Sequence, residues 1–284
     1  MRLLLLGKNG QVGWELQRSL APLGQVVALD FDSPGPLTAD LSQPERLAAT
    51  IREVAPDIIV NAAAHTAVDK CESEPDLARA INSTGPAVLA REAAARGAWL
   101  VHYSTDYVFD GSGSKPWRED DATGPLNVYG QTKLEGEQAI RASGCKHLIL
   151  RTSWVYAARG GNFAKTMLKL AQERERLTVI ADQIGAPTGA DLLADVTAHA
   201  VRAVVGNPGL SGTYHAVAGG ETSWHSYACH VIATARKCGL NLKVREDAID
   251  PVATGAFPSA AMRPANSRLN TEHLRGSFGV VMPD

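Results

Sequence analysis

The feature that most constrains the fold of this chain is a glycine-rich turn close to its N-terminus. Four consecutive leucines at positions 3–6 lead directly into the segment GKNGQVG at 7–13. A helical pattern follows over 14–20, and a second apolar run covers 25–30. A strand, a glycine turn, a helix and a second strand within so short a span form one βαβ unit. We therefore expect the chain to begin with two parallel strands joined by a helix.

The three glycines of this turn have the spacing of a dinucleotide-binding site. Gly7 allows the tight turn, Gly10 lets the backbone approach a pyrophosphate at the helix N-terminus, and Gly13 permits close packing of helix on strand. Asp30 ends the next strand, where an acid can accept hydrogen bonds from the ribose hydroxyls of adenosine. This context favours dinucleotide binding over a glycine turn in an unrelated α/β fold.

Apolar runs and helical patterns go on alternating up to about residue 155. We expect further strands over 57–61, 98–104 and 146–152, and helices over 42–54, 84–96 and 129–142. Ser42 and Glu45 have the spacing of a capping box at the start of the first of these helices. Strands that are apolar on both faces and separated by helices predict an α/β fold, a Rossmann-type doubly wound parallel sheet.

The rhythm changes in the second half, which contains many glycine- and proline-rich connectors. Helical patterns cover 162–174, 191–205 and 223–237, a short strand is expected over 214–217, and little periodicity follows 247. We expect residues 1–155 to form a dinucleotide-binding Rossmann domain. Residues 156–284 should mainly form a smaller substrate-binding lobe, with some segments returning to the Rossmann domain.

Composition excludes several classes of function. The net charge is −2 and no basic run is present, so a nucleic-acid partner is not expected. None of the four cysteines belongs to a CxxC pair or has metal-ligand spacing, which indicates reduced thiols. No stretch approaches the roughly 18 apolar residues of a membrane helix. We expect a cytoplasmic protein without a membrane partner.

Tyr129 and Lys133 are four residues apart in an expected helix and therefore share one face. A phenol has a pKa of about 10, and a neighbouring ammonium group lowers it. The pair predicts an acid–base tyrosine assisted by a lysine. Taken alone, a surface tyrosine beside a solvated lysine is the commoner interpretation of this spacing.

A hydroxyl-rich segment, STDYVF at 104–109, begins where an expected strand ends. Ligands of doubly wound sheets bind at the carboxyl ends of the strands. A hydroxyl at this place can orient a carbonyl oxygen beside the tyrosine, while the competing interpretation is a turn with capping hydroxyls. Each of these three motifs is common by chance. It is far less expected that the glycine turn, this segment and the tyrosine–lysine pair occur by chance in this order and spacing on one βαβ scaffold.

Longer segments carry a specific resemblance. They are GKNGQVG (7–13), VNAAAHTAVDKCESEP (60–75), STDYVFDG (104–111), GPLNVYGQTKLEGE (124–137), RTSWVY (151–156), GNFAKTML (161–168), DQIGAPTGADLLAD (182–195) and RPANSRLNT (263–271). With them the chain resembles the extended short-chain dehydrogenases/reductases and, within these, the dTDP-4-dehydrorhamnose reductases. The resemblance implies an NAD(P)-binding Rossmann domain over 1–155 and a smaller α/β lobe, mainly over 156–284, that binds a sugar nucleotide. It also implies reduction of the 4-keto group of dTDP-4-dehydro-L-rhamnose to dTDP-L-rhamnose with NADH or NADPH, in dTDP-rhamnose biosynthesis, by a homodimer.

The resemblance also implies roles for individual residues. The catalytic residues would be Thr105, Tyr129 and Lys133. The cofactor would be bound by Gly7, Gly10, Gln11, Val12, Gly13, Asp30, Asp40, Leu41, Ala63, Ala64, His65, Thr66, Tyr129 and Lys133. The substrate would be contacted by Thr105, Asp106 and Trp154, with Arg263 and Arg268 as weaker diphosphate candidates that compete with solvated surface arginines. His65 competes with a packing or capping histidine, and Trp154 with a core aromatic.

A metal ion has weaker support. Some relatives bind Mg²⁺ at a dimer interface through acidic side chains, and Glu15 matches such a position, whereas Asp191 stands where a glutamate is usual. Family members usually continue beyond the position of Asp284 into one more helix, and any further ligand of the metal would be expected there. We expect Mg²⁺, if bound, between two copies of the chain.

Two alternatives remain open. The first is another sugar-nucleotide epimerase or dehydratase of the same superfamily, although Tyr107 occupies the place where a 4,6-dehydratase needs a second acid. The second is a non-catalytic nucleotide-binding regulatory subunit, against which the retention of Thr105, Tyr129 and Lys133 argues. For the cofactor, Asp30 suits free ribose hydroxyls and would repel a 2′-phosphate, so we expect NADH to be used at least as well as NADPH.

Overall fold

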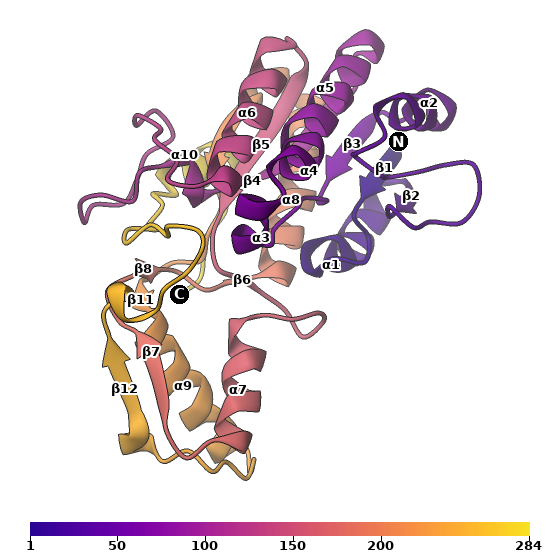
Figure 1. Ribbon diagram of the computed structural model, residues 1–284. Helices are drawn as coiled ribbons and strands as arrows, with labels where there is room; N and C mark the ends of the chain where they lie inside the picture. The colour runs from indigo at the N-terminus through magenta and orange to yellow at the C-terminus, as the bar shows by residue number, and fades with distance from the viewer.

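Six parallel strands form the central sheet of the protein, which a computed structural model describes over residues 1–284 (Figure 1). Their order across the sheet is β10-β5-β4-β3-β1-β2. The strands are β1 (Arg2–Leu6), β2 (Gln25–Leu29), β3 (Ile58–Asn61), β4 (Trp99–Thr105), β5 (Lys146–Thr152) and β10 (Gly212–His215). The strand order reverses between β3 and β1, and this is where a doubly wound sheet opens a crevice for a ligand. The expected fold class is confirmed.

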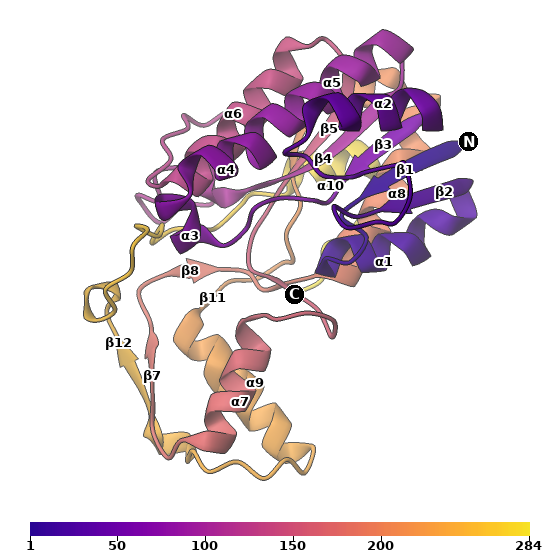
Figure 2. The same ribbon diagram turned by 45° about the vertical axis from the view of Figure 1, so that its right-hand side comes forward.

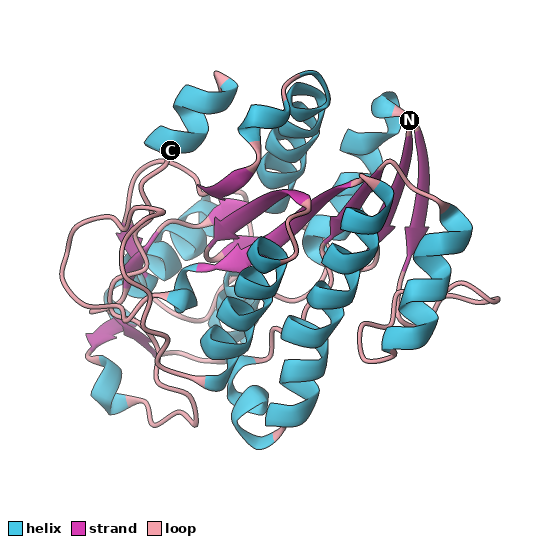
Figure 3. Ribbon diagram, turned by 90° about the horizontal axis from the view of Figure 1, so that it is seen from above, coloured by secondary structure: helices cyan, strands magenta, loops and turns pink.

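Helices cover both faces of this sheet, which explains the run of leucines in β1 (Figure 3). Leu3 and Leu5 belong to a core with α1 and α8, whereas Leu4 and Leu6 belong to a second core with α2 and α5. Successive strand residues point to opposite faces, so a strand between two helical layers is apolar throughout. The helices are α1 (Gln11–Leu20), α2 (Pro44–Val54), α5 (Gly85–Arg96), α6 (Val128–Ala142) and α8 (Ala190–Gly206).

The second half of the chain returns to the main body at three places. Val201 in α8 shares the core of Leu5 and Leu16, and β10 extends the sheet beside β5. Leu274 in the short helix α10 (Glu272–Phe278) joins the same core. Segments after residue 156 therefore add an edge strand to the central sheet and helices to the core on one of its faces.

The smaller lobe lies beyond the carboxyl ends of the strands (Figure 2). Its helices α7 (Phe163–Glu173) and α9 (Trp224–Lys237) pack with the parallel pair β7 (Leu177–Ile180) and β12 (Ile249–Val252) around a separate core. Two short ladders lie between this lobe and the sheet: β6 (Val155–Tyr156) with β9 (Thr188–Gly189), and β8 (Ile184–Gly185) with β11 (Thr222–Ser223). These ladders connect the smaller lobe to the main body near the carboxyl ends of the strands.

The capping box expected at Ser42 and Glu45 is wrong. Helix α2 begins at Pro44 with Gln43 as its N-cap, and no side chain caps it. The Ser42 hydroxyl instead donates to Asp40 Oδ1 at 2.6 Å. Proline is well suited to the first helical position because it has no N–H to satisfy there, and this shifts the start of the helix by two residues.

Several short elements were not expected from the sequence. They are α3 (Val68–Ser73), α4 (Pro75–Arg79), a π-turn over Ala80–Thr84, β12 and α10. Each is too short to show a clear period. No helix is both long and apolar enough to cross a membrane, and the four cysteines are unpaired.

Candidate active site

The glycine turn after β1 has the close packing that the spacing predicts. Gly7 has a φ of 84°, in the left-handed region, and a Cβ on Gly13 would lie 1.9 Å from the Gly7 carbonyl oxygen. Helix α1 starts at Gln11 with Gly10 as its N-cap and without a side-chain cap. The amide groups of its first turn are therefore free to bind an anion such as a pyrophosphate.

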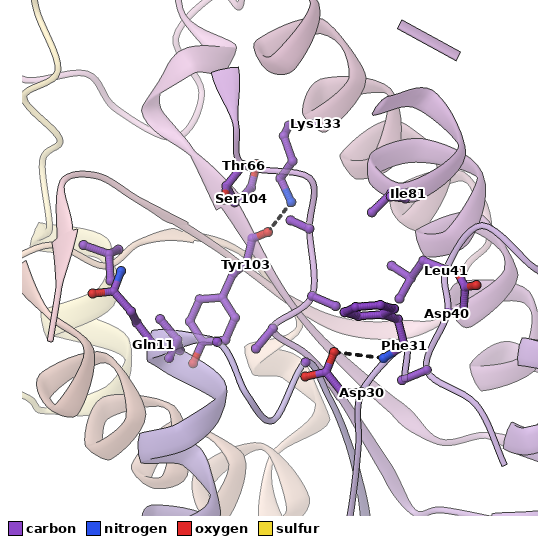
Figure 4. A pocket seen from close by; sticks show the side chains of 18 of the residues that line it. Gln11, Asp30, Phe31, Asp40, Leu41, Thr66, Ile81, Tyr103, Ser104 and Lys133 are labelled. Carbon is purple, nitrogen blue, oxygen red and sulfur yellow. Dashed lines mark hydrogen bonds between the residues drawn. The ribbon is translucent and has the colours of Figure 1, made fainter. Parts of the chain in front are cut away.

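A cavity of about 650 Å³ opens beside this turn, at the carboxyl ends of β1, β3 and β4 (Figure 4). Most residues expected to bind the cofactor line it. They are Gly7, Gly10, Gln11, Val12, Asp30, Asp40, Leu41, Ala63, Ala64, Thr66, Tyr129 and Lys133. Gly13 and His65 do not line it: Gly13 is buried beneath the turn, where its lack of a side chain lets α1 pack. The residues and the cradle fit a dinucleotide.

Asp30 is held rigidly at the wall of this cavity. Its Oδ2 accepts from the Asn9 amide at 2.9 Å and its Oδ1 from the Phe31 amide at 2.8 Å. Figure 4 shows the second of these bonds, with the Phe31 ring in the cavity beside it. A carboxylate fixed by two amides still has free lone pairs, so it can accept from ribose hydroxyls.

The His65 side chain has a structural environment outside the cavity. Its ring contacts Cys71 Sγ at 3.6 Å and Glu74 Oε2 at 3.2 Å, and its amide donates to Asn82 Oδ1 at 2.8 Å. These contacts anchor the loop after β3 to α3 and α4. His65 does not line the cavity, and the contacts of its ring agree with the packing interpretation.

Helix α6 brings the expected acid–base pair to the end of β4. The Asn127 side chain caps its first turn by accepting from the Gly130 amide at 2.8 Å. A Cβ on Gly130 would lie 2.2 Å from the Tyr107 carbonyl oxygen, so only glycine allows so close an approach of α6 to the loop after β4. The rings of Tyr107 and Tyr129 meet edge to face at 5.5 Å. Tyr129 is thereby held near Thr105.

The expected lowering of the Tyr129 pKa by Lys133 is wrong for this arrangement. Burial raises the pKa of Tyr129, and the Thr105 hydroxyl offsets only part of the rise. Lys133 is not among the groups that shift the Tyr129 pKa. Its Nζ donates to the Tyr103 carbonyl oxygen at 2.6 Å (Figure 4) and lies 3.1 Å from His102 Nε2. Burial also lowers the pKa of Lys133 to about 8, although Glu137 opposes this. A phenol with a raised pKa keeps its proton and can donate it.

Asp106 follows Thr105 and is only 2 % exposed. Its Oδ1 accepts from the Thr105 hydroxyl at 3.1 Å, while Oδ2 is buried without any hydrogen-bond partner. Burial raises the pKa of Asp106 to about 7, with Ser267 and Thr105 acting in the opposite direction. A buried carboxylate oxygen without a partner is costly, and a ligand hydroxyl would satisfy it.

Trp154 lies at the junction of the two bodies in a conformation that costs energy. Its φ is 49°, unusual for a bulky residue, and its ring stacks on Trp224 with centroids 3.5 Å apart. A Cβ on Gly185 would lie 2.7 Å from the Trp154 ring, so glycine makes room for it. The stack and the close backbone hold the indole at the junction of the two bodies, and it does not line the cavity beside the glycine turn.

The arginines considered for a diphosphate already have partners. Arg263 pairs with Asp69 at 2.6 Å, and Arg268 pairs with Glu221. Neither is a freely solvated side chain.

The acids considered for a metal are also engaged elsewhere. Glu15 lies 3.6 Å from Arg18, and Asp191 Oδ1 accepts from the Leu192 amide. No group of three or more His, Cys, Asp or Glu side chains is placed to hold a metal ion.

Comparisons with known proteins agree with this geometry. A family model described as the RmlD substrate binding domain matches residues 1–284. A protein of Shigella flexneri named dTDP-4-dehydrorhamnose reductase is 58% identical over 284 residues, which cover 100% of this chain and 94% of the relative. The chain belongs to the dTDP-4-dehydrorhamnose reductase family.

Solved structures of the dTDP-4-dehydrorhamnose reductase family share the whole architecture. A dTDP-4-dehydrorhamnose reductase from Clostridium acetobutylicum is 36% identical with a TM-score of 0.88, covering 100% of this chain and 95% of that one. A dTDP-4-dehydrorhamnose reductase from Bacillus anthracis in complex with NADP, also 36% identical, has a TM-score of 0.87 and the same coverage. The two-body architecture is therefore that of the dTDP-4-dehydrorhamnose reductase family.

Some residues at this site could not be predicted from the sequence. His102 and Asn61 are buried behind Lys133, and Ser267 faces Asp106 from the C-terminal loop. The only signal for His102 is a histidine within the otherwise apolar stretch WLVHY, and nothing in the sequence marks Ser267. These contacts depend on the register of the strands and on a loop that lies about 160 residues further along the chain from Asp106. Neither can be inferred from the amino-acid sequence.

Proposed function

We propose that this chain catalyses the NAD(P)H-dependent reduction of the C4 keto group of dTDP-4-dehydro-L-rhamnose, giving dTDP-L-rhamnose. The observation that carries the proposal is a single cavity lined by the glycine turn, Asp30, Tyr129 and Lys133. It joins a dinucleotide cradle to an acid–base tyrosine at the carboxyl ends of the strands. The full-length similarity to proteins named dTDP-4-dehydrorhamnose reductase supports the choice of substrate.

The chain's own residues then divide the chemistry. The nicotinamide, when bound, supplies the hydride that reduces the carbonyl carbon. Tyr129 donates the proton that the carbonyl oxygen needs as negative charge grows on it, and Thr105 donates a hydrogen bond to the same oxygen. Lys133 holds the nicotinamide ribose. General acid catalysis of this kind contributes roughly 10²- to 10⁴-fold to a rate.

The smaller lobe and the junction would bind the sugar nucleotide. Trp154, which stacks on Trp224 at the junction of the two bodies, would contact the sugar or base, and the unpartnered Oδ2 of Asp106 can accept from a sugar hydroxyl. Because the pKa of Asp106 is raised to about 7, this group is the alternative proton donor if Tyr129 is not the acid.

Homodimer formation and an interfacial Mg²⁺ are a separate part of the proposal. Glu15 on α1 and Asp191 at the start of α8 lie on two helices that pack together. These two carboxylates are too few for a complete site within one chain, so a second copy would have to supply further ligands. Sedimentation velocity with added Mg²⁺ and then with EDTA tests this proposal. A wild-type dimer that dissociates with EDTA, together with a Glu15→Gln protein that forms no Mg²⁺-dependent dimer, supports the site. A wild-type protein that stays monomeric with and without the metal refutes it.

The assay for the main proposal measures NADH or NADPH oxidation with dTDP-4-dehydro-L-rhamnose. One cofactor oxidised per dTDP-L-rhamnose formed, identified by NMR, is the expected result. Conversion of the sugar without net cofactor oxidation indicates an epimerase-like enzyme instead. Cofactor binding without any turnover indicates a regulatory nucleotide-binding protein.

A further inference from the structure

A chain of buried polar groups lies directly behind Lys133. Asn61 in β3 and His102 in β4 are opposite each other in the sheet register, and both are at most 1 % exposed. The Lys133 side chain, also 1 % exposed, reaches down from α6 to this pair. Buried hydrogen-bonding groups must satisfy one another, so the donors and acceptors in such a chain can be assigned.

The assignment starts from the backbone. The Ala63 amide donates to Asn61 Oδ1 at 3.1 Å, which fixes the orientation of the Asn61 side-chain amide. Its Nδ2 therefore faces His102 Nδ1 at 3.0 Å and donates to it. A flipped amide would turn NH₂ toward the Ala63 N–H and leave a buried donor without an acceptor, which is unfavourable. His102 Nδ1 is thus an acceptor.

The remaining proton of the neutral imidazole must then be on Nε2. This nitrogen lies 3.1 Å from Lys133 Nζ. An N–H that points at an ammonium group has no acceptor, whereas it can donate to the lone pair of a neutral amine. The amine can in turn donate to the Tyr103 carbonyl oxygen at 2.6 Å and keeps a second N–H for the cavity.

We propose that His102 is a positioning residue whose tautomer, fixed by Asn61, presents Nε2–H to Lys133 and stabilises the neutral amine relative to the ammonium in the free protein. Its function is to let Lys133 change its charge near neutral pH, where the acid–base chemistry of the site operates. The inference deepens the proposed function, because it assigns how the lysine of that site is prepared.

The charged groups around Lys133 are consistent with this role. Glu137, one turn further along α6, is the nearby group that favours the ammonium, but it is engaged by Arg151 at 2.8 Å and by Arg141 at 3.0 Å. Tyr129, one turn earlier, keeps its proton because burial raises its pKa. His102 itself stays neutral, since burial and then the neighbouring Lys133 hold its pKa well below the ordinary value.

The first experiment determines the tautomer without any assay of activity. In protein labelled with ¹⁵N-histidine, NMR at neutral pH distinguishes a protonated Nε2 from a protonated Nδ1, and His102→Gln assigns the resonance. We expect His102 to carry its proton on Nε2. Asn61→Asp should move the proton to Nδ1, because a carboxylate accepts where the amide donated. Asn82→Asp, another buried asparagine that does not contact His102, should leave the tautomer unchanged.

The second experiment measures the consequence for Lys133. NADH affinity, followed by fluorescence from pH 6 to 10, should fall as the lysine loses its charge at about pH 8. Asn61→Asp should move this midpoint upward by about one pH unit or more, since Nε2 then accepts from the ammonium. In a His102→Phe background the same Asn61→Asp change should move it far less.

Two results would overturn the inference. One is a wild-type His102 protonated on Nδ1. The other is an equal shift of the midpoint by Asn61→Asp with and without His102, which would assign the effect to added charge alone. Neither depends on turnover, so a failure of the proposed reductase activity is distinguishable from a failure of this inference.

Discussion

Two phenols lie side by side near Thr105, and only Tyr129 is on the helix that also carries Lys133. Tyr129→Phe removes the proton donor but keeps the ring, so we expect kcat to fall by roughly 10²- to 10⁴-fold with little change in cofactor affinity. Steady-state kinetics and NADH titration measure both quantities. Tyr107→Phe keeps the edge-to-face contact and should cost far less. A Tyr129→Phe enzyme with nearly full turnover would make Asp106 the leading donor, and an equal loss in both variants would assign the effect to the packing of the two rings.

The Asp30 carboxylate is fixed against two backbone amides at the cavity wall. It would repel the 2′-phosphate of NADPH, and no arginine follows it before Pro34. We expect kcat/KM with NADH to be at least equal to that with NADPH, and Asp30→Ala to raise the relative use of NADPH. A relative that binds NADP makes this a real test. An NADPH preference of more than tenfold in the wild-type protein would contradict the expectation.

At the scale of elements, the contact of α1 with the glycine turn joins fold and site. In Gly13→Ala the new methyl group would meet the Gly7 carbonyl oxygen, so α1 must move away from β1. We expect a loss of stability of about 1–3 kcal/mol, typical of overpacking, and cofactor affinity weakened at least tenfold. Urea denaturation and NADH titration measure these effects. Gly276→Ala in α10 has open space around it and should be neutral or slightly stabilising.

The long elements could be predicted from the sequence because many apolar residues in each of them repeat the same pattern. The strand over 146–152 is seen with the same bounds, since its apolar residues are buried between two helical layers. The region of 68–84 and the C-terminal segment were not predicted, because their short helices are stabilised by tertiary contacts rather than by an apolar period. Within the site, the glycine turn and the Tyr129–Lys133 spacing were visible in the sequence. The direction of the Lys133 side chain was not, since it depends on His102 and the Tyr103 carbonyl.

At the scale of the whole molecule, buried ionisable groups couple the main body to pH. His102 and His215 are fully buried and neutral, and the Glu137–Arg151 pair lies beneath α6. As the pH falls from 7 to 5, the buried histidines lower the free energy of unfolding, whereas Asp106 raises it. The pKa of Asp106 is raised in the folded state, so the folded protein binds this proton at a higher pH than the unfolded chain does. The net pH dependence of stability therefore contains opposing contributions. The contribution of one group is obtained by comparing a variant that lacks it with the wild type.

His215 offers the clearest such comparison. Both of its ring nitrogens are buried without a hydrogen-bond partner, and burial lowers its pKa to about 3, with Arg151 adding to the effect. In the unfolded chain a histidine has a pKa of about 6.5, so the unfolded state binds nearly one more proton at pH 5 than the folded state does. Because of this depressed pKa, His215 alone lowers the free energy of unfolding by about 2 kcal/mol when the pH falls from 7 to 5.

His215→Leu should remove that loss. Because neither ring nitrogen makes a well-formed hydrogen bond, and only the backbone of Trp117 and Asn270 lies near them, we expect the variant to be close to wild type in stability at pH 7. At pH 5 it should exceed the wild type by about 2 kcal/mol in the free energy of unfolding, measured by urea denaturation. His230→Leu changes an exposed histidine and should not alter the difference between the two pH values. Parallel loss of stability in His215→Leu and wild type would mean that the His215 ring is protonated, or reached by solvent, in the folded protein.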